Sequence, residues 1–274
     1  MSKENIVKIE QLFVGNSLRN FSYIIWSEAS KEAICLDPFS SEMVCTRLGE
    51  LGLVLKKIVN THEHWDHIQG NEALKKETGA SIYAHENAAG KFPVDQYLKA
   101  GDRLDLGDEE YLEVLDTPGH TFAHLCLLAS TKNRACAVFT GDTLFNAGVG
   151  NCGNGGDPRV LCQTIFNKFK TLDDGILIYP GHEYFENNLN FTLHIESENL
   201  KARELLSKCE SVDWDGEQKG FLVSTIGEER GVNTFFRTHL DSVSTSVQKI
   251  SKRTTPFESD EELFVTLRSL RNNW

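Results

Sequence analysis

One short segment of this 274-residue chain limits its folding more than any other: Thr61-His62-Glu63-His64-Trp65-Asp66-His67. It holds three of the nine histidines and an aspartate within six residues, directly after the strand-like run at 55–60. Burying so many polar side chains without partners would be costly. A histidine-rich solvated loop would avoid that cost, but the concentration of histidines favours a metal site. We therefore expect the fold to gather these side chains around metal.

The spacing within the segment predicts how the side chains can share their targets. Residues two apart in an extended stretch point to the same side, so His62 and His64 can bind one ion together. If the chain then turns toward the helix expected at 71–78, Asp66 and His67 can face a neighbouring point. Imidazole nitrogen combined with carboxylate oxygen suits zinc, iron(II) or manganese(II) better than calcium.

Three further candidate ligands come after strand-like runs elsewhere in the chain. His120 in TPGH, Asp142 in TGDT and His182 in PGH each follow such a run and a glycine. Glycine allows a tight turn close to an ion because it has no Cβ. Each residue alone would be interpreted as a surface histidine or a helix-capping aspartate. The threefold repetition of strand, glycine and ligand instead favours one shared metal site.

The remaining pattern predicts many strands and few helices in the first 185 residues. Strand-like runs lie at 21–26, 33–37, 55–60, 81–85, 111–116, 124–129, 136–140 and 176–180. Helices are expected at 40–51, at 71–78 and after Asp157, which can cap a helix that begins with Pro158.

The sequence changes character in the last third of the chain. Residues 196–210 are helix-like, 217–231 are irregular, and Ser259-Asp-Glu-Glu262 is a capping box ahead of a final helix. We expect two domains: a catalytic domain at 1–185 and a helical, substrate-binding domain at 186–274.

Composition excludes several classes of partner. The net charge of −12 and pI of about 5.2 disfavour nucleic acid, because an acidic surface repels phosphate. No apolar run approaches the ~20 residues that span a bilayer, and the first residues lack the apolar core of a signal peptide. An odd number of cysteines, seven, without a CxxC pair suits free thiols in a reducing compartment. We expect a cytoplasmic monomer that acts on a small molecule and binds no membrane.

The order of the motifs, HxHxDH, TPGH, TGDT and then PGH, resembles the metallo-β-lactamase superfamily. This resemblance implies an α+β fold, an αββα sandwich of two sheets flanked by helices, here with a C-terminal mainly helical domain. It also implies two divalent metal ions, zinc first, with iron or manganese as alternatives. The implied ligands of the first metal are His62, His64 and His120, those of the second are Asp66, His67 and His182, and Asp142 bridges both.

Longer motifs resemble the glyoxalase II (hydroxyacylglutathione hydrolase) branch. They are THEHWDH, TPGHTFAH, FTGDTLF, PGHEYFENNLNF and STIGEERGVNTFFR. The resemblance implies hydrolysis of S-(2-hydroxyacyl)glutathione, or a related thioester, to the acid and the free thiol by a metal-bound hydroxide. Two dications provide hydroxide at neutral pH because they lower the pKa of water. Asp66 would orient it, and His124 would support the ligands without binding metal.

The substrate contacts depart from the pattern of that branch. Tyr184 is retained, but Asn151 stands where a basic residue would meet a glutathione carboxylate. Cys152 lies in the same loop, as a substrate contact, a reactive thiol or an incidental residue. Arg237 remains in the altered NTFFR segment. These four residues are the candidate substrate contacts, and we expect weakened or altered glutathione recognition.

Other functions stay open on the sequence alone. The same site could hydrolyse another ester or a lactone, and the altered loop motivates this alternative. A persulfide dioxygenase with one iron resembles the superfamily too, but the helical tail and His124 argue against it. A binding protein without activity would be expected to lose ligands, and all seven are present.

Overall fold

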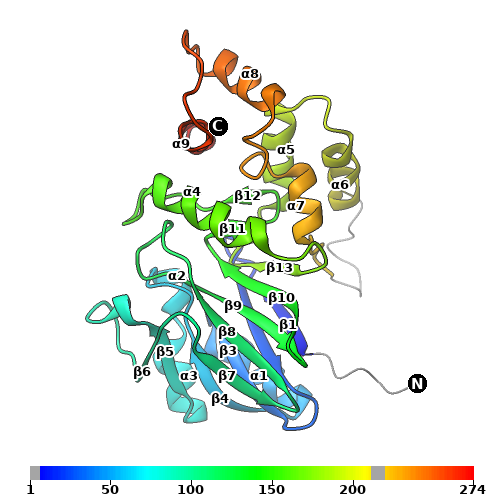
Figure 1. Ribbon diagram of the computed structural model, residues 1–274. Helices are drawn as coiled ribbons and strands as arrows, with labels where there is room; N and C mark the ends of the chain where they lie inside the picture. The colour runs from blue at the N-terminus through cyan, green and yellow to red at the C-terminus, as the bar shows by residue number, and fades with distance from the viewer. Residues whose placement is uncertain (1–6, 211–219) are drawn as a thin grey trace.

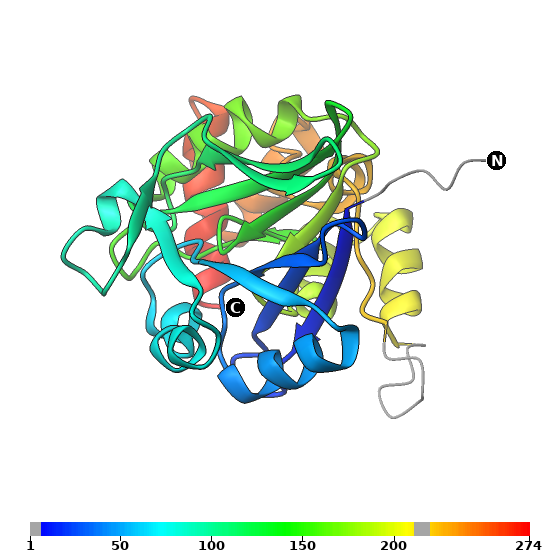
Figure 2. The same ribbon diagram turned by 90° about the horizontal axis from the view of Figure 1, so that it is seen from below.

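Two β-sheets pack face to face, with helices on their outer sides, in a computed structural model that describes residues 7–210 and 220–274 (Figure 1, Figure 2). The first sheet has the order β1-β2-β3-β4-β5-β6, with β1 Lys8–Phe13, β2 Phe21–Trp26, β3 Glu32–Leu36, β4 Val54–Val59, β5 Ser81–His85 and β6 Gln96–Leu98. The second has the order β13-β10-β9-β8-β7, with β7 Arg103–Gly107, β8 Glu110–Asp116, β9 Leu125–Thr131, β10 Arg134–Gly141 and β13 Leu177–Pro180. A short ribbon pairs β11 (Leu144–Phe145) with β12 (Gly148–Val149). The expected αββα sandwich is confirmed.

Strand β2 shows why the chain folds into layers. All six of its residues are buried, because both faces of the sheet are covered. Tyr23 and Ile25 pack into the core between the two sheets. Ile24 and Trp26 point the other way, into the core under the outer helices. The period of two along a strand thus divides its apolar residues between two cores.

The outer helices begin and end where the local signals predict. Helix α1 (Ser41–Leu51) begins after Ser40, whose side chain accepts a hydrogen bond from the Met43 amide. Helix α3 (Asn71–Thr78) ends at Gly79, with a left-handed φ of 74°. Helix α4 (Pro158–Asn167) covers the second sheet, and Asp157 caps it as expected.

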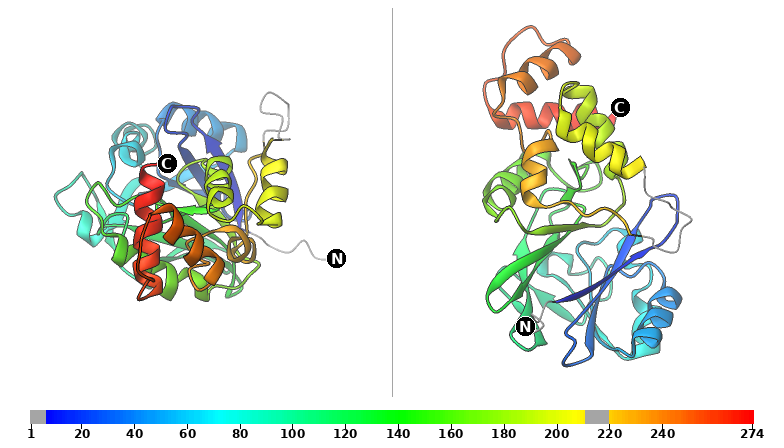
Figure 3. Two further views of the ribbon diagram at one scale, coloured as in Figure 1. Left: turned by 90° about the horizontal axis from the view of Figure 1, so that it is seen from above. Right: turned by 90° about the vertical axis from the view of Figure 1, so that its right-hand side faces the viewer.

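The C-terminal helices gather at one end of the sandwich (Figure 1, Figure 3). They are α5 Phe185–Ile195, α6 Leu200–Glu210, α7 Ile226–Val232, α8 Asp241–Ile250 and α9 Asp260–Asn272. A buried cluster joins α5, α7, α8 and α9 to the second sheet and α4, with Val138, Ile165 and Phe264 among its members.

Helix α7 corrects the expectation of irregular structure at 217–231. Residues 226–231 are helical, and 217–219 lie outside the described residues. A capping box explains the helix: Thr225 accepts from the Glu228 amide, and the Glu228 side chain accepts from the Thr225 amide. At α9 only half of the expected box forms. Ser259 caps the Glu262 amide, but the Glu262 carboxylate accepts from the Glu258 amide.

Candidate metal centre

The ends of four strands deliver the seven predicted ligands to one place. His62 and His64 follow β4, and the short helix α2 (Trp65–Ile68) then carries Asp66 and His67. The other three follow the ends of β8, β10 and β13: His120, Asp142 and His182. Both sheets therefore contribute to the site.

The donor atoms of these residues form three groups, each with all its atoms within 4.8 Å of one another. The groups are His62, His64 and His120; Asp66, His67 and His182; and His62, His67 and Asp142. The chain thus has histidine and aspartate clusters able to bind metal.

The histidine nitrogens converge on common points. His64 Nδ1 lies 3.0 Å from His62 Nε2 and 3.0 Å from His120 Nε2. Ligand atoms about 2.1 Å from a tetrahedral ion are separated by roughly 3.4 Å, so this spacing suits a shared ion. His67 Nε2 and His182 Nε2 form a similar pair 3.2 Å apart.

The opposite ring nitrogens are held by hydrogen-bond acceptors. His64 Nε2 lies 3.0 Å from the Asn154 carbonyl, and His120 Nδ1 lies 2.5 Å from the Asn151 carbonyl. His182 Nδ1 lies 2.8 Å from the Leu18 carbonyl. Such partners fix the tautomer, so the inward nitrogen keeps its lone pair for a metal.

Asp142 lies between the two sets of histidines. Its Oδ1 is 3.4 Å from His67 Nε2, and its Oδ2 is 3.6 Å from His120 Nε2 and 3.3 Å from His182 Nε2. Among the described residues, its buried Oδ1 has no hydrogen-bond partner. A buried carboxylate oxygen without a partner is costly, and a cation would satisfy it. The site therefore fits divalent metal ions.

The electrostatics of the cluster keep His62 neutral and Asp142 ionised, the forms that bind metal, whereas His67 holds a proton that a metal would displace. Burial lowers the pKa of His62 well below its usual value and keeps the ring neutral. Burial also lowers the pKa of His67, but Asp142 and Asp37 outweigh it and raise the pKa to about 9. Burial opposes ionisation of Asp142, but His182 and His67 hold its pKa well below the usual range. Asp142 is thus ionised, as metal binding requires.

Asp37 belongs to the site although the sequence did not single it out. It is buried and accepts from the Thr61 amide at 2.7 Å, the Thr61 hydroxyl at 2.6 Å and His67 Nδ1 at 2.9 Å. It therefore orients His67 and fixes the start of the histidine segment. The sequence feature that could have pointed to Asp37 is its place as a charged residue at the end of the apolar run AICLD.

His124 touches the cluster without joining any of its donor groups. Its Nε2 accepts a hydrogen bond from the Asp142 amide at 3.1 Å, and its ring stacks on His62 at 5.0 Å between centroids. This placement suits the supporting role expected of it.

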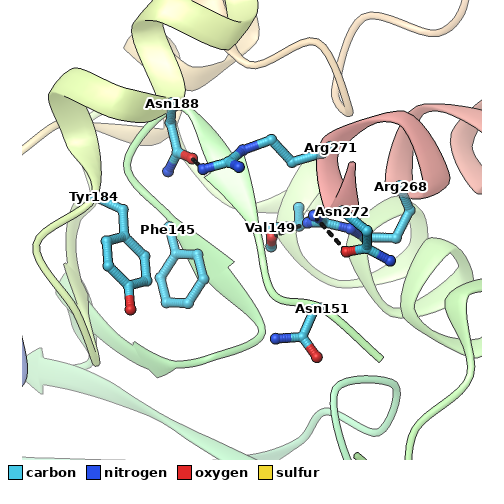
Figure 4. Close-up of a pocket in the computed structure, with 8 residues that line it drawn as sticks. All are labelled: Phe145, Val149, Asn151, Tyr184, Asn188, Arg268, Arg271 and Asn272. Carbon is cyan, nitrogen blue, oxygen red and sulfur yellow. Dashed lines mark hydrogen bonds between the residues drawn. The ribbon is translucent and has the colours of Figure 1, made fainter. Parts of the chain in front are cut away.

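A cavity of about 200 Å³ lies beside the cluster (Figure 4). The residues that line it are Phe145, Val149, Asn151, Tyr184, Asn188, Arg268, Arg271 and Asn272. The Tyr184 ring stacks on His182, with centroids 5.1 Å apart, so the cavity adjoins the cluster. It includes two of the four predicted substrate contacts, Asn151 and Tyr184.

The other two predicted contacts lie elsewhere. Cys152 packs partly buried against the core, and burial raises the pKa of its thiol to about 12. A thiol of this kind is a poor nucleophile at neutral pH. Arg237 donates to the Glu196 carboxylate, at 2.7 Å from Nη2, and to the Arg230 carbonyl. Neither residue lines the cavity.

Two arginines of α9, Arg268 and Arg271, line the cavity instead, and no motif in the sequence singled them out. Arg268 donates from Nη1 to the Val149 carbonyl at 2.6 Å, and Arg271 donates to Asn188 Oδ1 at 3.3 Å. Within 7–210 and 220–274, neither forms an ion pair with a carboxylate. Burial lowers the pKa of Arg268 to about 10, which still leaves it charged at neutral pH. The sequence feature that could have pointed to Arg268 and Arg271 is their position at the edge of the apolar stripe of the last helix.

Comparisons with known proteins divide the chain between two family profiles. The profile of the metallo-beta-lactamase superfamily matches residues 18–182, and that of the hydroxyacylglutathione hydrolase C-terminus matches 183–274. The hydroxyacylglutathione hydrolase of Nitrosococcus oceani is 42% identical over 97% of this chain and 99% of its own length. The chain belongs to the hydroxyacylglutathione hydrolase family. The resemblance to the glyoxalase II branch is thereby confirmed.

Other relatives agree with this assignment. The hydroxyacylglutathione hydrolase of a Polaromonas species is 41% identical over 97% of this chain and 99% of its own length. Among solved structures, ETHE1 from Myxococcus xanthus has a TM-score of 0.67 at 26% identity, covering 96% of this chain and 91% of its own. In the described part of this family member, no helix has the length and apolar character to cross a membrane.

Proposed function

We propose that this protein hydrolyses S-(2-hydroxyacyl)glutathione thioesters to the hydroxy acid and glutathione. One observation carries the proposal: a cluster of metal-binding side chains directly adjoins a cavity with two arginines that have no carboxylate partner among the described residues. The metal-binding cluster can activate a thioester, and the two arginines can hold an anionic thiol carrier. The relatives named hydroxyacylglutathione hydrolase support it.

The proposed site holds two divalent metal ions. His62, His64 and His120 would hold one, Asp66, His67 and His182 the other, and Asp142 would contact both. Zinc suits these donors, and iron(II) and manganese(II) are the alternatives. When bound, such ions polarise the thioester carbonyl and lower the pKa of water.

Asp66 would orient the attacking water at this site. Asn20 Nδ2 donates to Asp66 Oδ2 at 2.9 Å, and this oxygen also lies 3.5 Å from His182 Nε2. The carboxylate is therefore fixed on two sides. The leaving group is a thiolate, which is stable enough to depart without a strong general acid. His124 would hold Asp142 in place through the backbone amide.

The cavity would bind the glutathione portion of the substrate. Glutathione carries two carboxylates, and guanidinium groups bind carboxylates through charged hydrogen bonds. Arg268 and Arg271 supply the charge that Asn151 lacks, while Asn151 and Tyr184 add neutral donors. We therefore propose that the positive charge that recognises glutathione comes from α9 rather than from the 147–157 loop. In this scheme residues 186–274 complete the binding site of the catalytic domain at 1–185, within one chain that acts as a monomer.

The two arginines also bear on the alternatives. A neutral lactone or a simple ester offers no carboxylate to either side chain, so the cavity favours an anionic carrier. A dioxygenase would need one iron and would consume oxygen, whereas the arrangement of donors favours two ions.

The test is hydrolysis by the purified protein of S-lactoylglutathione, S-lactoyl-N-acetylcysteamine, a simple O-ester and a lactone, with bound metal measured by elemental analysis. We expect about two metal equivalents, loss of activity with a chelator, and the highest kcat/KM for the glutathione thioester. A preference for the lactone or the O-ester would refute the proposal. One iron per chain with oxygen consumption would support the dioxygenase instead.

A further inference from the structure

Helix α7 contains a buried acid that belongs to neither the metal cluster nor the cavity. Glu229 is fully buried. Its carboxylate accepts from the Ala147 amide at 2.9 Å, the Ser224 hydroxyl at 2.6 Å and Asn233 Nδ2 at 2.7 Å. All three donors are neutral, and no cation pairs with Glu229 among the described residues. A carboxylate suits this environment because it only accepts hydrogen bonds.

These contacts hold the turn of the β11–β12 ribbon from behind. Ala147 has a left-handed φ of 58°, a conformation that is unfavourable for a residue with a Cβ and that needs support from its surroundings. Its neighbours are held from the same side: Asn146 donates to the Ser224 hydroxyl at 2.7 Å, and Asn233 donates to the Gly148 carbonyl at 3.2 Å. Three successive residues are therefore fixed by the segment at 224–233.

The other side of this ribbon forms the wall of the cavity. Phe145 and Val149 flank the turn, and both line the cavity. The Val149 carbonyl accepts from Arg268, so the position of the ribbon also fixes that guanidinium (Figure 4). Contacts thus run without a break from Glu229, through the turn, to the cavity wall and Arg268.

We propose that Glu229 is a positioning residue for the thiol carrier, setting the β11–β12 ribbon and through it the wall and arginine that bind glutathione. The role rests on the proposed function, since it requires that the cavity bind the carrier. Glu229 itself touches no substrate, so its loss acts on binding rather than on the chemical step.

Glutamine is the informative replacement. Glutamine keeps the shape of the glutamate side chain, but its NH2 group, which is a donor, replaces one of the two acceptor oxygens. The new NH2 group must then face either the Ser224 hydroxyl or Asn233 Nδ2. Where it faces Asn233 Nδ2, two donors oppose each other and a buried polar group is left unsatisfied. The turn is expected to shift in response.

Protonation of the native side chain has a related effect. Burial raises the pKa of Glu229 to about 7, and the charge of the neighbouring Glu228 adds to the rise. A protonated Glu229 carries an O–H donor, although the groups around it, the Ala147 amide, the Ser224 hydroxyl and Asn233 Nδ2, are already donors. The KM difference between the native protein and the glutamine variant should therefore be larger at pH 8 than at pH 6.

The experiment compares Glu229→Gln with Glu228→Gln, the same change one residue away in the capping box. Each variant is assayed with S-lactoylglutathione and with S-lactoyl-N-acetylcysteamine, which lacks both carboxylates. For Glu229→Gln we expect a KM for the glutathione thioester about tenfold higher at pH 8, with unchanged bound metal, kcat within about threefold, and unchanged kcat/KM for the truncated thioester. Glu228→Gln should match the native protein.

Three outcomes would overturn the role. The first is a native KM in Glu229→Gln, and the second is an equal loss for both thioesters, which would mean general damage. The third is native protein that does not prefer the glutathione thioester, which would also refute the proposed function. If Glu229→Gln fails to fold, Ser224→Ala removes one donor to the carboxylate and should raise the same KM by a smaller factor, again without loss for the truncated thioester. A native KM in that variant would likewise refute the role.

Discussion

Replacing Arg271 by glutamine removes one of the two charges in the cavity and keeps an amide in its place. Arg271 lies against the rings of Phe191 and Trp274, with its guanidinium carbon 5.7 Å and 5.4 Å from their centroids. Among the described residues, Arg271 donates its hydrogen bond to a neutral amide, on Asn188. The charge is therefore held in place but left for the substrate.

The expected loss follows from that geometry. A hydrogen bond to a charged group contributes about 1.5–3 kcal/mol, and 1.4 kcal/mol corresponds to a factor of ten. Arg271 is half-buried, so solvent screening places its contribution near the lower end. KM for S-lactoylglutathione should rise about tenfold, while kcat stays within about threefold because the metal cluster is untouched.

Stability should change little in the same variant. Cation–π contacts contribute roughly 0.5–1 kcal/mol each, but removing a half-buried charge that has no carboxylate partner in the described part of the chain offsets that loss. We expect the free energy of unfolding, measured with urea, to stay within about 1 kcal/mol of the native value.

Arg159→Gln is the matched control. Arg159 of α4 is exposed and forms an ion pair with Glu261 of α9 at 3.2 Å. Such a surface ion pair contributes about 0–1 kcal/mol to stability. Arg159→Gln should leave KM unchanged. A native KM in folded Arg271→Gln, or an equal rise with S-lactoyl-N-acetylcysteamine, would refute electrostatic recognition by Arg271.

Four further changes test the rest of the site. Asp142→Ala should lose metal and activity together, and full metal occupancy with unchanged turnover would refute its bridging position. Asn151→Lys should lower KM for S-lactoylglutathione at similar turnover, and no change would mean that the α9 arginines alone hold the carrier. Gly150→Ala should reduce bound metal, measured by elemental analysis, because a Cβ there would lie 1.8 Å from the Asp142 carbonyl oxygen; native metal content would contradict this. Glu229 has a folded-state pKa of about 7 against an ordinary 4.5, so the folded protein binds more protons between these values and its unfolding free energy should fall by about 3 kcal/mol as pH rises from 4.5 to 7. Urea unfolding of Glu229→Gln should lack that part of the decline, and identical pH profiles would count against the raised pKa.

The metal cluster was predictable because its information is local. His62, His64, Asp66 and His67 lie in one segment after β4, and their spacing fixes which side each faces. His120, Asp142 and His182 repeat a strand–glycine–ligand pattern that can be recognised without knowing how the strands pair. Convergence then needs only that the strands end at a common edge.

The residues that line the cavity were not predictable in the same way. Cys152 and Arg237 were chosen by their place in motifs, but packing turned Cys152 toward the core and Glu196 engaged Arg237. Asp37 was passed over because its partners, Thr61 and His67, lie 24 and 30 residues away in sequence.

The arginines of α9 separate what the sequence predicts from what only the tertiary structure determines. The stripe of Phe264 and Leu267 predicts which face of the helix is buried, and Arg268 and Arg271 follow each of these by four residues. The sequence therefore places both arginines at the edge of the buried face. What they meet there depends on how α9 packs on α4 and on the β11–β12 ribbon, whose turn is fixed by Glu229 from a different helix. Helix periodicity is a property of neighbouring residues, whereas the cavity exists only after packing has joined segments more than a hundred residues apart.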